Sequence, residues 1–363
     1  MKPLRGTAAY VGIGTSLDEI EAHLDEAAEL GINAVFTSLQ LPEADIEQTL
    51  RDFPKMAEIA HRYGMLVDAD IATRTATRFG IDMFDTRALK QLGLDIARYD
   101  GGCTTEDLVR LTHNNDGLII DLNAAEVTIE QLEAFDALGI NKENAHFCHN
   151  YHPMRYTGLK LEQAAEKNAM IHKFGYRVAG FIPGVSHRRI ACKIGLPTVE
   201  RHRDMSVFTS ITEAFLLGFD DLFFGDDLAS REELRILAEA ESDVTTFRAE
   251  LYDDGDVAEW LIGRKLDQLQ IAPDEIIRSH FNRKESIYPG GYDGGLERER
   301  HRGDITIASS RMWRYSGEVQ IARMDLPCDP EMRIVGRIID EDMPLLDAFH
   351  LGKRKPFRFI KAN

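Results

Sequence analysis

A repeat of helix, glycine and short apolar strand runs through the first two thirds of the chain and constrains its fold more than any other feature. Six glycines carry the repeat: Gly31, Gly64, Gly93, Gly139, Gly175 and Gly218. Each stands where an amphipathic segment ends and an apolar run begins, which is the position of a left-handed helix cap. Two further apolar runs, at 8–14 and 117–125, raise the number of expected strands to eight.

Eight strands that alternate with helices predict a closed parallel (β/α)8 (TIM) barrel. We expect the strands at 8–13, 33–39, 65–70, 95–100, 118–123, 145–150, 178–183 and 221–225, and a closing helix over 230–240. Ser16, and Thr104 or Thr105, are expected to cap helices. In such a barrel the catalytic groups lie at the carboxyl ends of the strands.

The chain is longer than one barrel requires. A barrel takes about 250 residues, and this chain has 363. The pattern changes near residue 242, where an alternating segment (VTTFRAELY) and a helical one (257–269) lead into short β-like runs at 304–309, 317–324 and 332–339. We therefore predict a barrel domain over 1–241 and a small antiparallel β barrel or sandwich over 242–363.

Composition excludes several classes of partner. A net charge of −18 argues against nucleic acid, because binding a polyanion needs clustered cations. A few local arginines could still bind a small anion. Cys103, Cys148, Cys192 and Cys328 show no zinc spacing and are expected to be free thiols. The absence of a long apolar run predicts no membrane partner and a cytoplasmic location. Self-association into a homo-oligomer stays open.

Acidic residues end three successive expected strands: Asp70, Asp100 and Asp121, the last followed by Asn123. Neighbouring strands lie about 4.8 Å apart, so these carboxyl groups can converge. Glycoside hydrolysis needs two carboxyl groups, about 5 Å apart for retention and about 6.5–9.5 Å apart for inversion. The structural alternative is that some of them pair with Arg98 or Arg74, or cap a helix.

The string HNYHPMRYTGL, residues 149–159, is the most distinctive of the chain. His149, Asn150 and Tyr151 end or follow a strand, and Arg155 in the loop could bind a phosphate or carboxylate with two parallel hydrogen bonds. Alternatively Arg155 pairs with a surface acid. The segment GVSHRR (184–189) is either an anion clamp or a solvated charge run, and we favour the latter. GIGTS (12–16) is too short to assign as a phosphate loop.

A metal-dependent barrel is a third interpretation, with His149, Asp70, Asp100 and Asp226 as nitrogen and oxygen ligands. The first strand lacks an HxH pair, and neither HxxxH nor HExxH occurs. We therefore expect no metal and no other cofactor.

These motifs resemble the bacterial outer surface protein family, whose characterised members are 6-phospho-N-acetylmuramidases (6-phospho-muropeptide glycosidases). The matching strings include Asp70, Arg98-x-Asp100, HNYHPMRYTGL, GLPTVERHRD (195–204), RGDITI (302–307) and RYSGEVQI (314–321). The resemblance implies a TIM barrel with a cyclophilin-like C-terminal β-barrel domain. It implies hydrolysis of a 6-phosphorylated amino sugar in cell-wall recycling by carboxylate acid/base chemistry.

The expected catalytic residues are then Asp70, Asp100 and Asp121. The expected substrate-binding residues are Arg98, Asn123, His149, Asn150, Tyr151 and Arg155, with Arg278 from the second domain. Where the family has Glu-Leu-Asn, this chain has Asp121-Leu122-Asn123, so we rank Asp70 and Asp100 above Asp121. The rival hypotheses are a non-catalytic phospho-sugar or muropeptide binding protein and a metal-dependent hydrolase or isomerase.

Overall fold

The chain divides into two compact units, which are described separately. A computed structural model describes residues 2–99, 101–189, 193–253, 255–269, 273–280, 288–351 and 355–362. The first unit comprises Met1–Ala214 and Gly218–Ala240, and the second comprises Phe215–Leu217 and Glu241–Asn363.

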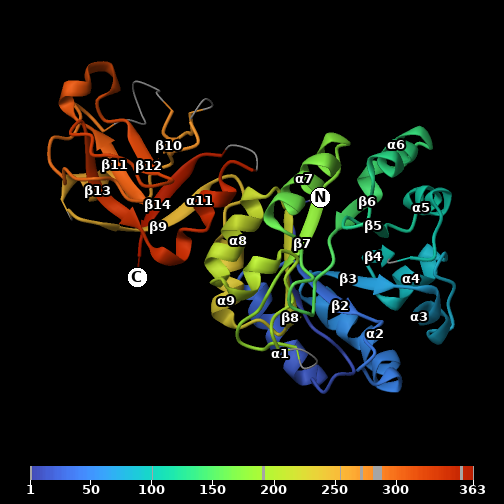
Figure 1. Ribbon diagram of the computed structural model, residues 1–363. Helices are drawn as coiled ribbons and strands as arrows, with labels where there is room; N and C mark the ends of the chain where they lie inside the picture. The colour runs from blue at the N-terminus through green and yellow to red at the C-terminus, as the bar shows by residue number, and fades with distance from the viewer. Residues whose placement is uncertain are drawn as a thin grey trace. The chain divides into compact units, whose positions relative to one another are not determined.

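The first unit is a closed barrel of parallel strands, in which each strand pairs with the next and β8 pairs with β1 (Figure 1). The strands are β1 (Arg5–Ala8), β2 (Ala34–Ser38), β3 (Leu66–Ile71), β4 (Ile96–Tyr99), β5 (Ile119–Asn123), β6 (Ala145–Cys148), β7 (Val178–Ile182) and β8 (Asp221–Asp227). The predicted (β/α)8 barrel is confirmed.

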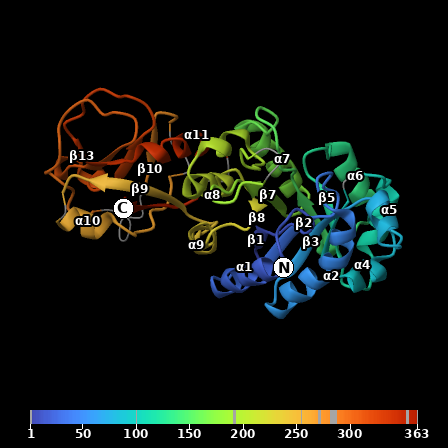
Figure 2. The same ribbon diagram turned by 90° about the horizontal axis from the view of Figure 1, so that it is seen from below.

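Helices surround the barrel, as Figure 2 shows for α1 and α2 outside β1, β2 and β3. They are α1 (Leu17–Glu29), α2 (Ile46–Arg62), α3 (Thr73–Arg78), α4 (Thr86–Leu92), α5 (Thr105–Thr112), α6 (Ile129–Ala137), α7 (Leu161–Lys173), α8 (Val207–Leu216) and α9 (Arg231–Glu239), with short 3-10 turns η1 (Lys142–Asn144) and η2 (Glu200–Asp204). Ser16 and Thr104 form capping boxes with Glu19 and Asp107, as predicted.

The glycines of the repeat all adopt positive φ, between 73° and 112°. Gly93 has the largest of these angles, at 112°, and its amide donates to the end of α4. A Cβ atom at this position would lie 2.4 Å from the Cβ of Ala57 on α2. Gly93 therefore satisfies both a left-handed turn and a close approach between a helix end and the neighbouring helix.

The position expected for the first strand was wrong. β1 covers Arg5–Ala8, and the apolar residues that follow it belong to a loop. Gly12 and Gly14 have φ of 82° and 108°, which a strand cannot accommodate. The apolar run is explained instead by burial, because Tyr10 and Val11 are almost completely buried at the end of the barrel.

The second unit contains a six-stranded sheet in the order β10-β12-β11-β13-β9-β14. Its strands are β9 (Thr245–Leu251), β10 (Ile276–Arg278), β11 (Asp304–Ala308), β12 (Val319–Ala322), β13 (Met332–Ile338) and β14 (Phe357–Lys361), with α10 (Asp256–Leu261), α11 (Leu345–Ala348), η3 (Ser310–Tyr315) and η4 (Asp340–Asp342). The runs expected at 304–309, 317–324 and 332–339 correspond to β11, β12 and β13. A smaller β domain is thus confirmed, and its likeness to cyclophilin stays a prediction.

Two details of this domain differ from expectation. The sheet is mixed, because β14 pairs with β9 in parallel. The helix expected over 257–269 ends at Leu261, since Gly263 has φ 78° and Leu266 and Gln268 bridge to extended segments. Leu266 follows the helical spacing but is buried in an extended segment that bridges to Phe357.

Gly93→Ala should destabilise the barrel by about 2–4 kcal/mol, because it combines left-handed strain with overpacking against Ala57. Gly31→Ala is the matched control, with φ 90° and no atom within 4 Å of the added Cβ, and should cost only about 1 kcal/mol. Urea unfolding of both variants measures the difference. Equal losses would show that the contact with Ala57 does not constrain this turn.

Candidate active site

The barrel interior is divided into an apolar half and a polar half. Phe36, Phe181 and Phe223, from β2, β7 and β8, pack with ring centroids 4.9 to 6.4 Å apart. Strands β3 to β6 instead contribute buried ionisable side chains: Asp68, Asp70, Arg98, Asp121 and His146. The register pairs Asp70 with Arg98, Arg98 with Asp121, and Asp121 with His146, which places these four on one side of the sheet. Four adjacent strands therefore supply these five ionisable side chains, and Asp221 of β8 adds a further buried carboxylate in contact with His146.

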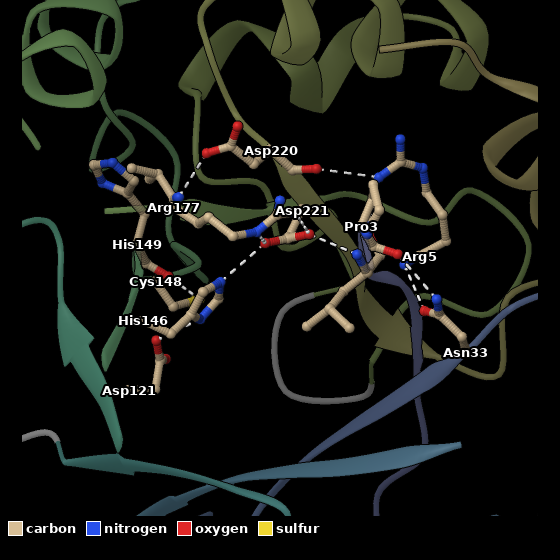
Figure 3. A network of polar contacts seen from close by, with 12 residues as sticks. Pro3, Arg5, Asn33, Asp121, His146, Cys148, His149, Arg177, Asp220 and Asp221 are labelled. Atoms are coloured by element: carbon tan, nitrogen blue, oxygen red, sulfur yellow. Dashed lines mark hydrogen bonds and ion pairs between the residues drawn. The ribbon is translucent and has the colours of Figure 1, made fainter. Parts of the chain in front are cut away.

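A buried chain of charges lies at the base of the polar half (Figure 3). His146 contacts Asp121 through Nδ1 at 2.8 Å and Asp221 through Nε2 at 3.0 Å. Arg177 donates to the same Asp221 through Nε at 3.1 Å. Burial alone would lower the pKa of His146, but the two carboxylates outweigh it and raise the pKa to about 10. His146 is therefore an imidazolium that donates from both nitrogens and joins β5, β6 and β8.

Arg98 connects this chain to the mouth of the barrel. Its Nε lies 3.7 Å from Oδ2 of Asp121, and its Nη2 donates to Oδ1 of Asn150. The Arg98 side chain is only 4% exposed and that of Asp121 is fully buried. Asp121 is thus held between two cations beneath the mouth, whereas Asn150 lies at its rim and is half-buried.

Asp70 is the last inward-facing residue of β3 and lies at the mouth of the barrel. Its carboxylate accepts hydrogen bonds from Oγ of Ser38 at 2.9 Å and from the backbone N–H of Leu39 at 3.2 Å. Hydrogen bonds of this kind stabilise the ionised form of a carboxyl group. Asp70 also pairs in register with Arg98, so two hydrogen-bond donors and an arginine on the neighbouring strand lie beside its position at the mouth.

Asp68, two residues deeper on the same strand, was missed by the sequence analysis. It is completely buried, and neither carboxyl oxygen has a hydrogen-bond partner among the described residues. Burial, with the charge of Asp121 adding to it, raises the pKa of Asp68 well above its ordinary value. The alternation in Val67-Asp68-Ala69-Asp70 was the available signal, since both acids face the barrel interior if one does.

Aromatic rings and an arginine form the opposite wall of the mouth. The hydroxyl of Tyr151 accepts a hydrogen bond from Nη1 of Arg189 at 3.0 Å, and the Arg189 guanidinium lies 5.0 Å and 5.2 Å from the ring centroids of Tyr10 and Tyr151. Glu43, from the loop after β2, lies 3.5 Å from Nε of Arg189. Burial, reinforced by the charge of Asp70, raises the pKa of Tyr151. Tyr151, predicted from its string, and Arg189 therefore belong to the mouth that holds Asp70.

The segments HNYHPMRYTGL and GLPTVERHRD are joined by an ion pair between the buried Arg203 and the half-buried Glu200. Arg203 donates to the carbonyls of Gly195 at 2.7 Å and His152 at 3.0 Å, and to the carboxylate of Glu200. Glu200 in turn accepts from the backbone N–H groups of Tyr156 and Gly158, both at 2.8 Å. The Arg203–Glu200 pair thus ties the loop after β6 to the loop after β7.

Arg155 lies on the outside of this loop pair. Its guanidinium makes two hydrogen bonds to the carboxylate of Asp204, at 2.9 Å and 3.1 Å, and its side chain is 43% exposed. This is the surface-acid arrangement considered as the alternative. A phosphate would have to compete with Asp204, and anion binding by Arg155 stays a prediction.

His149 does not share the mouth with Asp70, contrary to expectation. Its Nε2 contacts Oδ1 of Asn168 on α7 at 2.8 Å, and its ring packs edge-on against Phe219. Burial lowers the pKa of His149 to about 4, so the ring is neutral. The side chain lies on the opposite face of the strand to His146, three residues earlier, and Figure 3 shows it pointing away from the His146 chain.

Asn123 ends β5 and is half-buried. Its Oδ1 accepts from the backbone N–H of Ala125 at 2.9 Å, which forms a turn after the strand. Asp100 falls outside the described residues. Arg278 belongs to the second unit, where it makes hydrogen bonds of 2.7 Å and 2.8 Å to Glu318. A role for any of these three in substrate binding or catalysis stays a prediction.

The last two residues of β8 hold the neighbouring loops. Asp226 accepts from the backbone N–H groups of Gly184, Arg189 and Leu196, at 2.9 to 3.0 Å. Asp227 accepts from the N–H of Tyr10 at 3.1 Å and from Oγ1 of Thr15 at 2.8 Å. Asp226, considered above as a metal ligand, is therefore committed to the loop after β7.

Two family models match the chain, one for each part. The model described as 6-phospho-N-acetylmuramidase, N-terminal, matches residues 5–239, and the model described as 6-phospho-N-acetylmuramidase, C-terminal, matches residues 268–360. The chain belongs to the 6-phospho-N-acetylmuramidase family. The resemblance predicted from its motifs is therefore confirmed.

Solved structures support the same two-part fold for this 6-phospho-N-acetylmuramidase family member. An uncharacterized B. cereus protein is similar with a TM-score of 0.82 at 24% identity, over 99% of this chain and 100% of that chain. A conserved Enterococcus faecalis protein with an unknown function is similar with a TM-score of 0.68 at 23% identity, over 99% and 97%. No curated protein matches the sequence.

Within the described part of the chain, no helix is long and apolar enough to cross a membrane. The same residues hold no group of three or more His, Cys, Asp or Glu side chains placed to bind a metal ion. Cys103, Cys148 and Cys328 are free thiols, as predicted, and Cys192 lies outside the described residues.

The buried imidazolium predicts a pH dependence of stability. The pKa of His146 is about 10 in the folded barrel, against about 6.5 in an unfolded chain. The stabilisation is therefore fully present below about pH 6.5 and declines as pH rises toward 10, by up to about 1.4 kcal/mol per pH unit. Urea unfolding at several pH values should show a shallower decline for His146→Gln than for the unchanged protein.

His113→Gln is the control, because His113 lies on the surface, where its Nε2 contacts the carbonyl oxygen of Gly139. The His113→Gln variant should show the same decline of the free energy of unfolding with pH as the unchanged protein. An identical slope in His146→Gln would show that His146 is not charged in the barrel.

Proposed function

We propose that this protein is a glycosidase that hydrolyses the glycosidic bond of a 6-phosphorylated amino sugar, as a 6-phospho-N-acetylmuramidase in cell-wall sugar recycling. The match of both family models carries the proposal. The barrel supports it, because Asp70, Arg98, Asn150 and Tyr151 meet at the strand ends where barrel enzymes place their catalytic groups. The substrate is a small molecule, and the proposed location is the cytoplasm.

In this proposal Asp70 acts as the ionised carboxylate. The hydrogen bonds from Ser38 and Leu39 fix its orientation and favour its negative form. An ionised carboxylate beside the anomeric carbon stabilises the positive charge that develops in the transition state, as nucleophile or as base toward water. The Arg98–Asn150 pair positions polar groups beside it for the sugar hydroxyls.

The second carboxyl group protonates the leaving oxygen as the bond from this oxygen to the anomeric carbon breaks. Water then supplies the hydroxyl to the sugar carbon, and its proton returns to a carboxylate. We assign the acid to Asp100, which follows Arg98 and Tyr99 in the sequence. Asp121 suits this role less well, because His146 and Arg98 hold its oxygens below the mouth.

Asp70→Asn and Asp100→Asn should each lower kcat on a chromogenic 6-phospho-sugar by about 10²–10⁴-fold or more. The pH–rate profile of the unchanged enzyme should be bell-shaped. Asp116→Asn is the control, because Asp116 accepts from Oγ1 of Thr86 away from the barrel mouth, and it should retain kcat. Near-native rates in both test variants would refute this mechanism.

The rival hypotheses give different results in the same assay. A binding protein would bind the phosphorylated sugar without turnover. A metal-dependent hydrolase or isomerase would lose its activity with chelation and regain it with added metal. Loss of turnover on chelation would therefore overturn the proposal even if the sugar is bound.

A further inference from the structure

A cavity of about 670 Å³ opens among the loops that follow β1, β7 and β8. The mechanism proposed above does not use it. Its lining combines two segments that the sequence analysis left without a function, GIGTS (12–16) and GVSHRR (184–189), with Lys193 and the end of β8. These two segments are about 170 residues apart in the sequence and face one cavity because the barrel closes between β8 and β1.

The loop after β1 presents backbone N–H groups to this space. Gly12 and Gly14 have φ of 82° and 108°, and a Cβ atom at Gly14 would meet no atom within 4 Å. Among the described residues, the N–H groups of residues 13–15 donate no hydrogen bond. Successive N–H groups in a turn of this kind form a concave site for anions.

The loop after β7 supplies cations. Arg188, Arg189 and Lys193 line the cavity, and the imidazole of His187 lies beside them in its lining. Nε of Arg188 donates to the carbonyl of Gly184 at 3.1 Å, a neutral partner that holds the side chain without cancelling its charge. No contact of the Lys193 ammonium group occurs within the described ranges.

Acids are present as well, but their oxygens are engaged. Glu19 accepts from the N–H and Oγ of Ser16 in the capping box of α1. Asp227 also lines the cavity and accepts hydrogen bonds from the N–H of Tyr10 and Oγ1 of Thr15. Its neighbour Asp226 accepts hydrogen bonds from three backbone N–H groups of the loop after β7. Burial raises the pKa of Asp227, which disfavours its negative form. These contacts fix both loops, and Arg188, Arg189 and Lys193 leave the cavity positive in a chain of net charge −18.

We infer that this cavity is the subsite for the phosphate monoester of the substrate, with Lys193 and Arg188 as the charged contacts and the N–H groups of residues 13–15 as neutral donors. This inference rests on the proposed function. It replaces the loop of Arg155 as the site of phosphate recognition, since the carboxylate of Asp204 already accepts the hydrogen bonds from Nη1 and Nη2 of Arg155. Loops after strands 7 and 8 commonly bind phosphate in barrel enzymes.

Arg189 connects the subsite with the catalytic groups. It lines the cavity and also donates to Tyr151 on the wall of the mouth. A sugar whose phosphate lies against Lys193 can therefore extend past Arg189 and Tyr151 toward Asp70. The phosphate then orients the reacting end of the sugar.

Calorimetric titration with N-acetylglucosamine 6-phosphate, N-acetylglucosamine and inorganic phosphate tests this assignment. Lys193→Gln is the principal variant, because it removes a charge that has no hydrogen-bond or ion-pair partner among the described residues. It should weaken binding of the phosphorylated sugar at least tenfold and reduce its advantage over the unphosphorylated sugar by the same factor. Arg188→Gln should have a similar effect.

Two controls distinguish a loss of binding at this subsite from a general effect of removing a positive charge and from phosphate binding at the loop of Arg155. Lys55→Gln removes the same charge from α2, where Lys55 pairs with Asp52, and should bind as the unchanged protein does. Arg155→Ala removes the rival contact. If Arg155→Ala weakens phosphorylated-sugar binding and Lys193→Gln does not, the inference is overturned.

The same measurements distinguish a failure of the subsite assignment from a failure of the proposed function. If the unchanged protein hydrolyses a 6-phospho-sugar and both cavity variants keep the unchanged KM, the function stands and this subsite is wrong. If the cavity variants weaken inorganic phosphate but not the phosphorylated sugar, the cavity binds an independent anion, which also overturns it. If the unchanged protein neither binds nor hydrolyses a 6-phospho-sugar, the proposed function fails first.

Discussion

The polar interior of the barrel depends on one buried imidazolium, His146, which lies between Asp121 and Asp221. Two carboxylates from β5 and β8 would repel each other in the barrel interior, and the shared cation makes their burial tolerable. Removing any member leaves an uncompensated charge in a low-dielectric space. The position of Arg98 depends on the same arrangement, because Asp121 lies beneath its guanidinium.

The mouth above this chain is held by polar contacts to backbone rather than by apolar packing alone. Asp226 and Asp227 hold the loops after β7 and β1, and the Arg203–Glu200 pair holds the loops after β6 and β7. Fixed loops keep donors and charges in place before a ligand arrives, which lowers the cost of ordering them on binding. The conspicuous string GLPTVERHRD is explained by this role, with Arg203 buried and its partners mostly carbonyls.

The barrel could be predicted from sequence because its signals are local. Left-handed glycines and capping residues act within a few positions along the chain, and Gly93, Ser16 and Thr104 behave as expected. The first strand was misplaced because burial of Tyr10 resembles burial in a strand. The parallel β14 was missed because its partner β9 lies about a hundred residues earlier, beyond any local pattern.

The site was less predictable for the same reason. Asp70 and Tyr151 could be found from strand ends and strings, but the partners of Arg155 and His149 depend on residues far away, Asp204 and Asn168. Asp68 and His146 carry no motif, and only the inward alternation of their strands could have indicated them. Arg189 was assigned to a solvated run, although Tyr10 and Tyr151 cover its guanidinium in the folded chain.

The pairing of β9 with β14 has a consequence for how the second unit folds. β9 is its first strand and β14 its last, so residues 245–249 meet residues 357–361 only after the intervening chain has been synthesised. Until then β9 is an open edge, with unpaired N–H and C=O groups that can recruit a foreign strand. Such a long-range closure is slow relative to local structure. The nascent second unit is therefore vulnerable to aggregation during translation, between the synthesis of β9 and that of β14. The length of this interval depends on the rate of synthesis and not on the stability of the folded sheet.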